Sequence, residues 1–176
     1  MQFLSFFEYP VQLGYLFGAN RIYRAFNNLF GPVSQAFMPI ISSVQEKNKN
    51  ESKLLIKKYL LLMVIFGLSL FFLNFFCAEI IVTILLGSKY HSSIELLKIF
   101  SIILPLTAIS NAIGRQWLIA NNKDFYYFFS QSLSLLVAFI IFLLLVSNQG
   151  PKALPISLIF YELTSIIMIL IFLYLK

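Results

Sequence analysis

The sequence predicts an all-helical integral membrane protein, and its composition supports this fold class in three ways. Hydrophobic residues make up 60% of the 176 residues, and charged residues make up only 11%. Soluble domains, by comparison, contain roughly 45–50% apolar and 25% charged residues. The mean hydropathy of this chain is +0.87. The single Cys and single His, Cys77 and His91, exclude an intrachain disulfide and a zinc cluster. We expect Cys77 to face lipid or to pack against a neighbouring helix.

Five segments are long and apolar enough to cross a bilayer, which takes roughly 20 apolar residues per helix. The expected spans are 14–42, 57–77, 94–119, 125–147 and 153–175, with a short interfacial helix near 78–86 that Gly87 ends. Proline removes a helix hydrogen bond, so Pro32 and Pro39 predict a kink or an end in the first span. Pro105 predicts a kink in the third.

Polar segments separate the spans and are predicted to be loops and turns. Residues 42–53 are polar and charged and are expected to form a loop, as are residues 87–93. Residues 121–124 and 147–152 carry turn-forming residues. We expect residues 1–176 to form a single membrane domain of about five transmembrane helices.

The sequence lacks the motifs of common enzymes. It contains no phosphate-binding P-loop, no H-E-x-x-H and no G-x-S-x-G motif. We therefore expect no catalytic residue, no bound metal and no cofactor. The composition also argues against a nucleic-acid partner. Movement or recognition of a membrane-associated substrate is the better functional class.

Lysine and arginine residues are distributed unevenly between the two sides of the predicted topology. One side carries eight of them: Lys47, Lys49, Lys53, Lys57, Lys58, Arg115, Lys123 and Lys176. The other side carries Lys89, Lys98 and Lys152. Because cytoplasmic loops are rich in Lys and Arg, the sequence predicts an external N-terminus and a cytoplasmic C-terminus. An external start without an export signal suggests that the chain begins in the middle of a larger protein.

The first span carries a polar stripe. At about 100° per residue, its polar and small side chains share one face: Asn20, Arg24, Asn27, Asn28, Gly31, Ser34 and Gln35, with Arg21 at the edge. An arginine at the bilayer centre costs about 2.5–3.5 kcal/mol, so the stripe is expected to face a water-filled cavity or another helix. The candidate substrate-binding residues are Asn20, Arg21, Arg24, Asn27, Asn28 and Gln35.

Two interpretations of the stripe remain open. A cationic cavity wall suits an anionic substrate, since Arg21 and Arg24 can contact phosphate through their forked donors. Alternatively, both arginines reach the lipid headgroups by snorkelling, and the amides simply join neighbouring helices.

Other polar and aromatic residues are candidates for smaller roles. Glu162 lies within the last span, so ion coupling, pairing with an arginine and a hydrogen bond to a neighbouring helix all remain open. Glu79 is expected at the external interface. Trp117, Tyr126 and Tyr127 are typical of an aromatic belt near the cytoplasmic boundary.

Three stretches carry a family resemblance. They are LGYLFGANRIYRAFNNLFGPVSQAFMPIIS (13–42), AEIIVTILLGSKY (78–90) and LPLTAISNAIGRQWLIANNKD (104–124). In this order they resemble the O-antigen (Wzx-type) polysaccharide flippases of the multidrug/oligosaccharidyl-lipid/polysaccharide exporter superfamily. These often carry a G-Y-[FY]-x-x-A-x-R-I-x-R-A-F run followed by P-x-S-Q-A-x-x-P, and later an N-x-x-G-x-Q-W-L element.

The resemblance implies a twelve-helix transporter of two six-helix lobes in the bacterial inner membrane. Such a protein passes undecaprenyl-diphosphate-linked oligosaccharide from the cytoplasmic to the external leaflet, and Arg21 and Arg24 would meet the lipid-linked diphosphate. This chain would form spans eight to twelve, as a truncated or split-gene fragment. The expected partners are the lipid-linked anionic oligosaccharide, membrane lipids, a missing N-terminal lobe that is a separate chain or lost, and a polysaccharide polymerase.

Two other functions remain open. The first is export of drugs or other small molecules by a member of the same superfamily. The second is a non-transporting membrane scaffold for polysaccharide assembly, which would co-purify with a polymerase or a glycosyltransferase.

Overall fold

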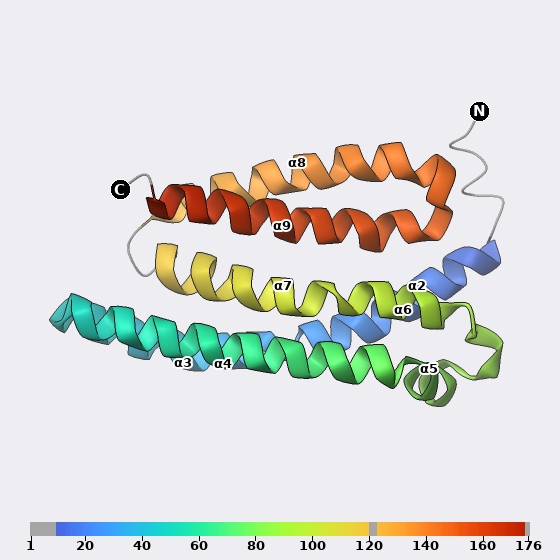
Figure 1. Ribbon diagram of the computed structural model, residues 1–176, viewed down its shortest axis with the longest axis horizontal. Coiled ribbons are helices and arrows are strands. Elements are labelled where there is room, and N and C mark those ends of the chain that lie inside the picture. Colours follow the sequence, from blue (N-terminus) through green and yellow to red (C-terminus); the bar gives the residue numbers. More distant parts are fainter. Residues whose placement is uncertain (1–9, 120–122, 175–176) are drawn as a thin grey trace.

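The computed structural model describes residues 10–119 and 123–174, and all the regular elements in these residues are helices. The long helices lie along the longest axis of the molecule (Figure 1). The predicted all-helical membrane fold is therefore confirmed. Residues 1–9, Ala120, residues 121–122 of one predicted turn, Leu175 at the end of the last expected span, and Lys176 lie outside the described residues.

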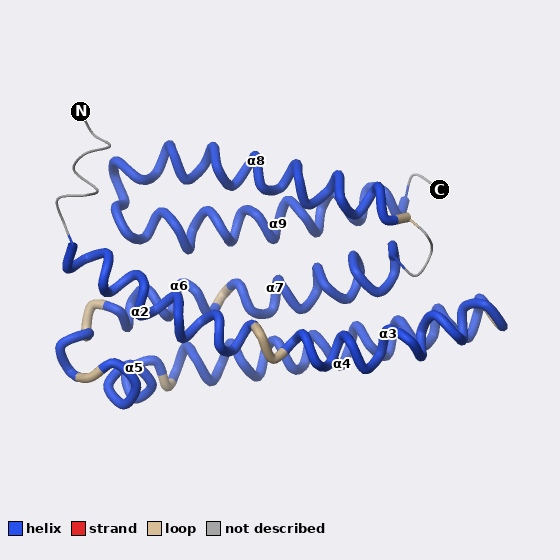
Figure 2. The backbone as a smooth tube through the Cα atoms, turned by 180° about the vertical axis from the view of Figure 1, so that it is seen from behind, coloured by secondary structure: helices blue, strands red, loops and turns tan. Residues whose placement is uncertain are grey.

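The first expected span is divided between two helices, α2 (Pro10–Asn27) and α3 (Phe30–Lys47), which together run the length of the molecule (Figures 1 and 2). Neither helix is among the described stretches that are long and apolar enough to cross a membrane, so this first pass stays a prediction. The break at Asn28 and Leu29 confirms the interruption expected from Pro32. Proline lacks the N–H that would bond the carbonyl four residues earlier, which belongs to Asn28. The N–H of Gly31 bonds this carbonyl instead, at 3.2 Å. Pro39 lies inside α3 without ending it.

The expected loop at 42–53 is wrong. Helix α3 continues to Lys47, and α4 (Lys49–Phe76) begins two residues later, so Asn48 alone forms the turn. Asn48 has an extended backbone (φ −151°, ψ 104°), and its Oδ1 accepts a hydrogen bond of 3.4 Å from the N–H of Glu51. Asparagine is a favoured helix N-cap, so it starts α4 without a longer loop.

Helix α5 (Ala78–Leu86) follows α4 after one residue, Cys77, which is half-buried. It is seen nearly end-on in Figure 1, across the ends of the long helices. Gly87 ends it with φ +90°, a conformation that suits glycine. The predicted division of this region into a long apolar helix and a separate short helix is confirmed, and the interfacial position of α5 stays a prediction.

The third pass contains η1 (Ser88–Tyr90), α6 (Ser93–Ser101), α7 (Ile103–Ser110) and the π-helical segment η2 (Asn111–Ile119). Helix α6 ends and α7 begins on either side of Ile102, three residues before Pro105. The helix is therefore interrupted close to the proline that predicts a kink.

The last two passes form an antiparallel pair (Figure 1). They are α8 (Asp124–Gln149) and α9 (Ala153–Tyr174), joined by η3 (Gly150–Lys152). Three stretches are long and apolar enough to cross a membrane: Glu51–Phe76, Ser93–Arg115 and Asp124–Tyr174. The third stretch folds back at η3 and therefore supplies two passes.

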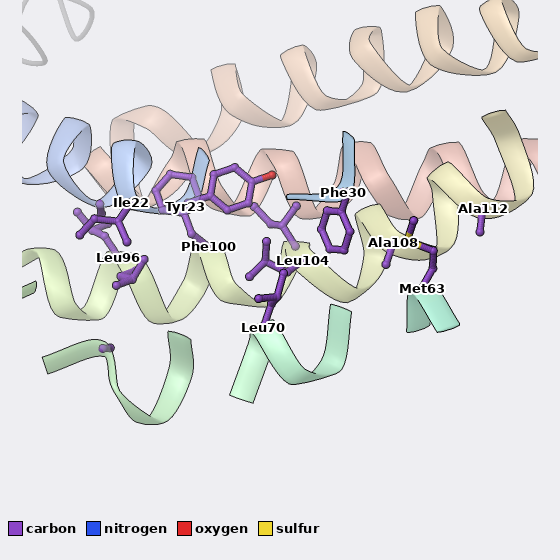
Figure 3. Packing of buried hydrophobic residues seen from close by; sticks show 14 of the residues in the cluster. Ile22, Tyr23, Phe30, Met63, Leu70, Leu96, Phe100, Leu104, Ala108 and Ala112 are labelled. Carbon is purple, nitrogen blue, oxygen red and sulfur yellow. The ribbon is translucent and has the colours of Figure 1, made fainter. Parts of the chain in front are cut away.

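The bundle is built by pairwise packing of helices. Helix α7 lies between α4 and α9, α8 packs on α9, α2 packs on α6, and α3 packs on α4. The buried cluster between them includes Ile22, Phe30, Met63, Phe100 and Leu104 (Figure 3). The outer faces of α4 and α8 expose large apolar side chains, which suits contact with lipid.

The connections gather at two ends of the molecule. The turn at Asn48 and the last residues of η2 lie at the end where α9 finishes, whereas η1, α5 and η3 lie at the end where α2 begins (Figure 1). The turn between Lys47 and Lys49 therefore lies at the opposite end of the bundle from η1 and η3, which carry Lys89 and Lys152.

Candidate functional site

One face of α2 is apolar and packs against α6. Leu16, Ala19 and Ile22 are buried on it. Tyr23 is buried as well, and its ring stacks on that of Phe100 with centroids 5.1 Å apart (Figure 3). These contacts leave the other face of α2 open.

The open face of α2 is polar and lines a shallow pocket of about 420 Å³. Its lining residues are Phe17, Asn20, Arg21, Arg24, Ala25 and Asn28. Arg21, Arg24 and Asn28 are exposed, and Asn20 is half-buried. The structure thus brings together Asn20, Arg21, Arg24 and Asn28 from the substrate-binding residues expected from the sequence. We call this surface the α2 pocket.

The other two candidates, Asn27 and Gln35, do not line the α2 pocket. Asn27 lies at the edge of the stripe nearest the buried face of α2 and is half-buried. Its Oδ1 is buried without a hydrogen-bond partner among the described residues. Gln35 is exposed on α3, beyond the break at Asn28, so it does not continue the helical phase of α2.

The two small residues of the stripe also separate. Ser34 is buried, and its Oγ lies 2.9 Å from the Oη of Tyr59 in α4. Gly31 has open space where a Cβ would lie. The continuous stripe expected from one helix therefore becomes a pocket on α2 and a helix contact on α3.

The uncharged stretch of the second pass indicates which residues lie near the middle of the membrane. No charged residue lies between Lys58 and Glu79, which matches the roughly 20 residues needed to cross the hydrocarbon. Gly67 lies near the middle of this stretch. A Cβ on Gly67 would be 2.8 Å from the Cβ of Ala108, so this part of α7 lies at the same depth.

Arg24 lies near this depth too. Tyr23 belongs to the same buried cluster as Leu104 and Ala108 of α7, and Arg24 follows Tyr23 in α2. Either edge of the hydrocarbon is then about 15 Å away, farther than an arginine side chain extends. Snorkelling therefore explains Arg24 less well than Arg21, which lies one turn closer to the end of the bundle.

Glu162 of α9 is buried and hydrogen-bonded to α7. Its Oε1 accepts a hydrogen bond of 2.8 Å from Thr107 Oγ1, and its Oε2 accepts one of 2.6 Å from Ser110 Oγ. Among the side chains that the structure describes, the one ion pair joins Lys152 and Glu95. The geometry supports the hydrogen-bonded interpretation of Glu162, and ion coupling stays a prediction.

A second polar cluster joins α8 and α9 and was not expected from the sequence. The hydroxyl of Tyr161 donates to Gln131 Oε1, and Gln131 Nε2 donates to Ser165 Oγ at 3.1 Å. The sequence does contain a signal for this cluster. Gln131 lies within one apolar span, and Tyr161 and Ser165 lie four residues apart in the next. Polar side chains in spanning helices commonly bond across helices in this way.

The remaining candidates lie near the ends of the helices. Glu79 is exposed in the first turn of α5, Trp117 packs against the buried cluster, and Tyr126 is exposed. Tyr127 is half-buried and contacts α7's continuation at Gly114, where a Cβ would be 2.7 Å from its ring. The part of the chain that the structure describes holds no group of three or more residues suited to bind a metal ion.

The fold and the α2 pocket define a class of protein: a helical membrane protein that crosses the bilayer several times and carries a cationic pocket between its ends. Comparison with known proteins narrows this class. Residues 9–95 match the family model described as "Polysaccharide biosynthesis protein". A protein of Escherichia coli (strain K12) named "Putative O-antigen transporter" is 32% identical over 124 residues, which cover 69% of this chain and 30% of that relative.

Over its matching residues the chain belongs to the polysaccharide biosynthesis protein family. The matched region includes the whole α2 pocket. The chain spans about 30% of the length of the E. coli relative. No solved structure matches the chain.

Proposed function

We propose that this chain takes part in moving a lipid-linked anionic oligosaccharide across the bacterial inner membrane for polysaccharide biosynthesis. The proposed substrate is an O-antigen repeat unit linked to undecaprenyl diphosphate. The observation that carries this proposal is the α2 pocket, with Arg21 and Arg24 exposed on one face inside the apolar part of the bundle. The family match and the name of the E. coli relative support the polysaccharide context.

The chemistry of the α2 pocket favours an anion. Arg21 and Arg24 are almost one turn apart, so their guanidinium groups can bind oxygens of the same diphosphate. The amides of Asn20 and Asn28 add neutral hydrogen-bond donors. The lining residues include no carboxylate, so a cationic drug finds no opposite charge there. This argues against multidrug export.

We propose that a second lobe covers the α2 pocket and encloses a water-filled cavity. Each arginine left in contact with lipid at mid-bilayer would cost about 2.5–3.5 kcal/mol. The relative is longer than this chain, and its remaining length is sufficient for another lobe. In this proposal the described helices form part of a C-terminal lobe, and transport proceeds by rocking against an N-terminal lobe. A polysaccharide polymerase is a further proposed partner.

Binding of a lipid diphosphate tests the substrate class. The probe is undecaprenyl diphosphate, compared with undecaprenol, which lacks the phosphates, and the chain is purified in detergent. Arg24→Gln and Arg21→Gln should each weaken diphosphate binding about tenfold, since each removes charged hydrogen bonds. Arg115→Gln, an exposed arginine outside the pocket, is the matched control. Equal binding of both lipids would refute the proposal.

Surface polysaccharide in the host organism tests transport. Arg24→Glu should abolish O-polysaccharide display while the protein still inserts into the membrane, because the new carboxylate repels the diphosphate. Arg115→Glu should leave display unchanged. Normal display in the Arg24→Glu strain would remove the cavity hypothesis.

A further inference from the structure

A second pocket lies at the end of the bundle where α2 begins. It has a volume of about 320 Å³ and is lined by residues of α2, α6 and the connection between α8 and α9. Its polar lining residues are Gln12, Tyr15, Ser92, Glu95, Gln149 and Lys152. It shares no lining residue with the α2 pocket. We call it the end pocket.

The walls of the end pocket are held in place by contacts between segments distant in sequence. Ser93 Oγ donates a hydrogen bond of 2.9 Å to the backbone carbonyl of Tyr15, which fastens α2 to α6. The ring of Tyr15 meets that of Tyr90 edge to face, with centroids 5.8 Å apart. An aromatic side chain is thereby fixed in one wall before any ligand binds.

The opposite wall is set by the turn between α8 and α9. Gly150 has φ +53°, a conformation that suits glycine, and Pro151 follows it with a restricted φ. This turn places Gln149 and Lys152 in the pocket. Lys152 Nζ lies 2.5 Å from Glu95 Oε1 of α6, so the two walls are also linked by an ion pair.

We propose that the end pocket binds a neutral sugar residue. Each sugar hydroxyl both donates and accepts a hydrogen bond, and the pocket offers both functions: Glu95 accepts, Lys152 donates, and the two amides do both. The ring of Tyr15 supplies an apolar surface for the carbon face of a sugar. A preformed concave site with a few fixed polar groups is the usual form of a small-molecule site.

The same lining disfavours other small ligands. Glu95 repels an anion such as free phosphate, and it already neutralises Lys152 through the ion pair. The pocket therefore has no net charge from its described side chains, in contrast to the α2 pocket with its two arginines. This inference does not depend on the proposed transport function, because it rests on the lining of a separate pocket.

Sugar binding to the purified chain tests the proposal. The protein is held in a detergent without a sugar headgroup, and saturation-transfer NMR is recorded with the methyl glycosides of glucose, galactose and N-acetylglucosamine as probes. We expect at least one probe to bind. Glu95→Ala and Gln149→Ala should each weaken its binding, by about tenfold for the charged Glu95 and less for the neutral amide.

Matched controls keep the test specific. Glu79→Ala removes an exposed carboxylate at the same end of the bundle, and Asn148→Ala removes the amide beside Gln149; neither residue lines the pocket. Arg24→Gln, which should weaken undecaprenyl diphosphate binding, should leave sugar binding unchanged. Failure of all three probes to bind overturns the proposal, as does binding that survives both pocket variants or is lost only in Arg24→Gln.

Discussion

The hydroxyl of Thr107 lies 2.8 Å from Glu162 Oε1, and this hydrogen bond joins α7 to α9 inside the bundle. Ser110 of the same helix donates a hydrogen bond of 2.6 Å to the other oxygen, Oε2. Two hydroxyl groups of α7 therefore hold the buried carboxyl group of α9. This arrangement gives Glu162 a defined structural role whether or not it also takes part in ion coupling.

Two substitutions of Glu162 distinguish the contribution of its hydrogen bonds to stability from the contribution of its charge. Glu162→Leu removes the acceptors of Thr107 and Ser110 and should lower the free energy of unfolding by about 1–2 kcal/mol, the range for polar contacts between spanning helices. Glu162→Gln keeps one acceptor oxygen and adds a donor that either hydroxyl can accept, so its loss should be less than half as large. Unfolding of the purified protein in mixed micelles measures both.

The exposed Glu95 at the end of the bundle is the control for a general effect of removing carboxylates. Glu95→Leu should change stability by no more than about 1 kcal/mol, as expected for an exposed ion pair. Equal losses for Glu162→Gln and Glu162→Leu would show that the charge of the carboxyl group, rather than its hydrogen bonds, stabilises the bundle.

The close contact of α4 and α7 at Gly67 leads to a second prediction. A Cβ at this position would lie 2.8 Å from the Cβ of Ala108 and 3.1 Å from the Cα of Pro105, so the two helices must separate. Gly67→Ala should therefore destabilise the protein by about 1–3 kcal/mol, as overpacking does in a filled core. The same unfolding experiment measures it.

Gly31 provides the matched control. A Cβ at this position would meet nothing within 4 Å, and alanine favours helix more than glycine does by about 1 kcal/mol. Gly31→Ala should thus be neutral or slightly stabilising. A similar loss at both glycines would contradict the close approach of α4 and α7.

Hydrophobicity and proline positions predicted most of the fold. The apolar runs gave the spans that became α4, α8 and α9, and Pro32 and Pro105 marked the interruptions at Asn28 and Ile102. These features act locally, since a span needs a certain number of apolar residues and proline breaks its own helix. The polar segment 42–53 was misinterpreted because charged residues indicate the exit from the membrane, whereas a helix can continue into water.

The candidate site was predicted less completely, for reasons of tertiary structure. The spacing of Asn20, Arg21, Arg24 and Asn28 was enough to place them on one face of α2. Gln35 is separated from them by the break after Asn27. The calculation of about 100° per residue assumes one continuous helix, so it cannot give the direction of a side chain beyond a break. The end pocket is lined by three segments that are distant in sequence, so no local sequence pattern predicts it.

The proposed orientation predicts which end of the bundle reaches the cytoplasm. In a Cys77→Ala background, Asn48→Cys and Ser88→Cys place single thiols at opposite ends, both at exposed positions. In intact cells an external, membrane-impermeant maleimide should label Ser88→Cys and spare Asn48→Cys, because Lys-rich connections stay in the cytoplasm. Both should react after the cells are opened. The reverse pattern would invert the proposed topology.

Water access to the α2 pocket distinguishes a cavity wall from a lipid-facing surface. In the Cys77→Ala background, Asn28→Cys places a thiol in the pocket without removing either arginine, and Leu73→Cys places one on the exposed apolar face of α4. Thiolate is the reactive form and requires a polar environment. In reconstituted vesicles, a charged thiol reagent should therefore modify Asn28→Cys at least ten times faster than Leu73→Cys. Undecaprenyl diphosphate should slow the reaction at residue 28 alone, whereas equal slow rates at both positions would mean that lipid covers the pocket.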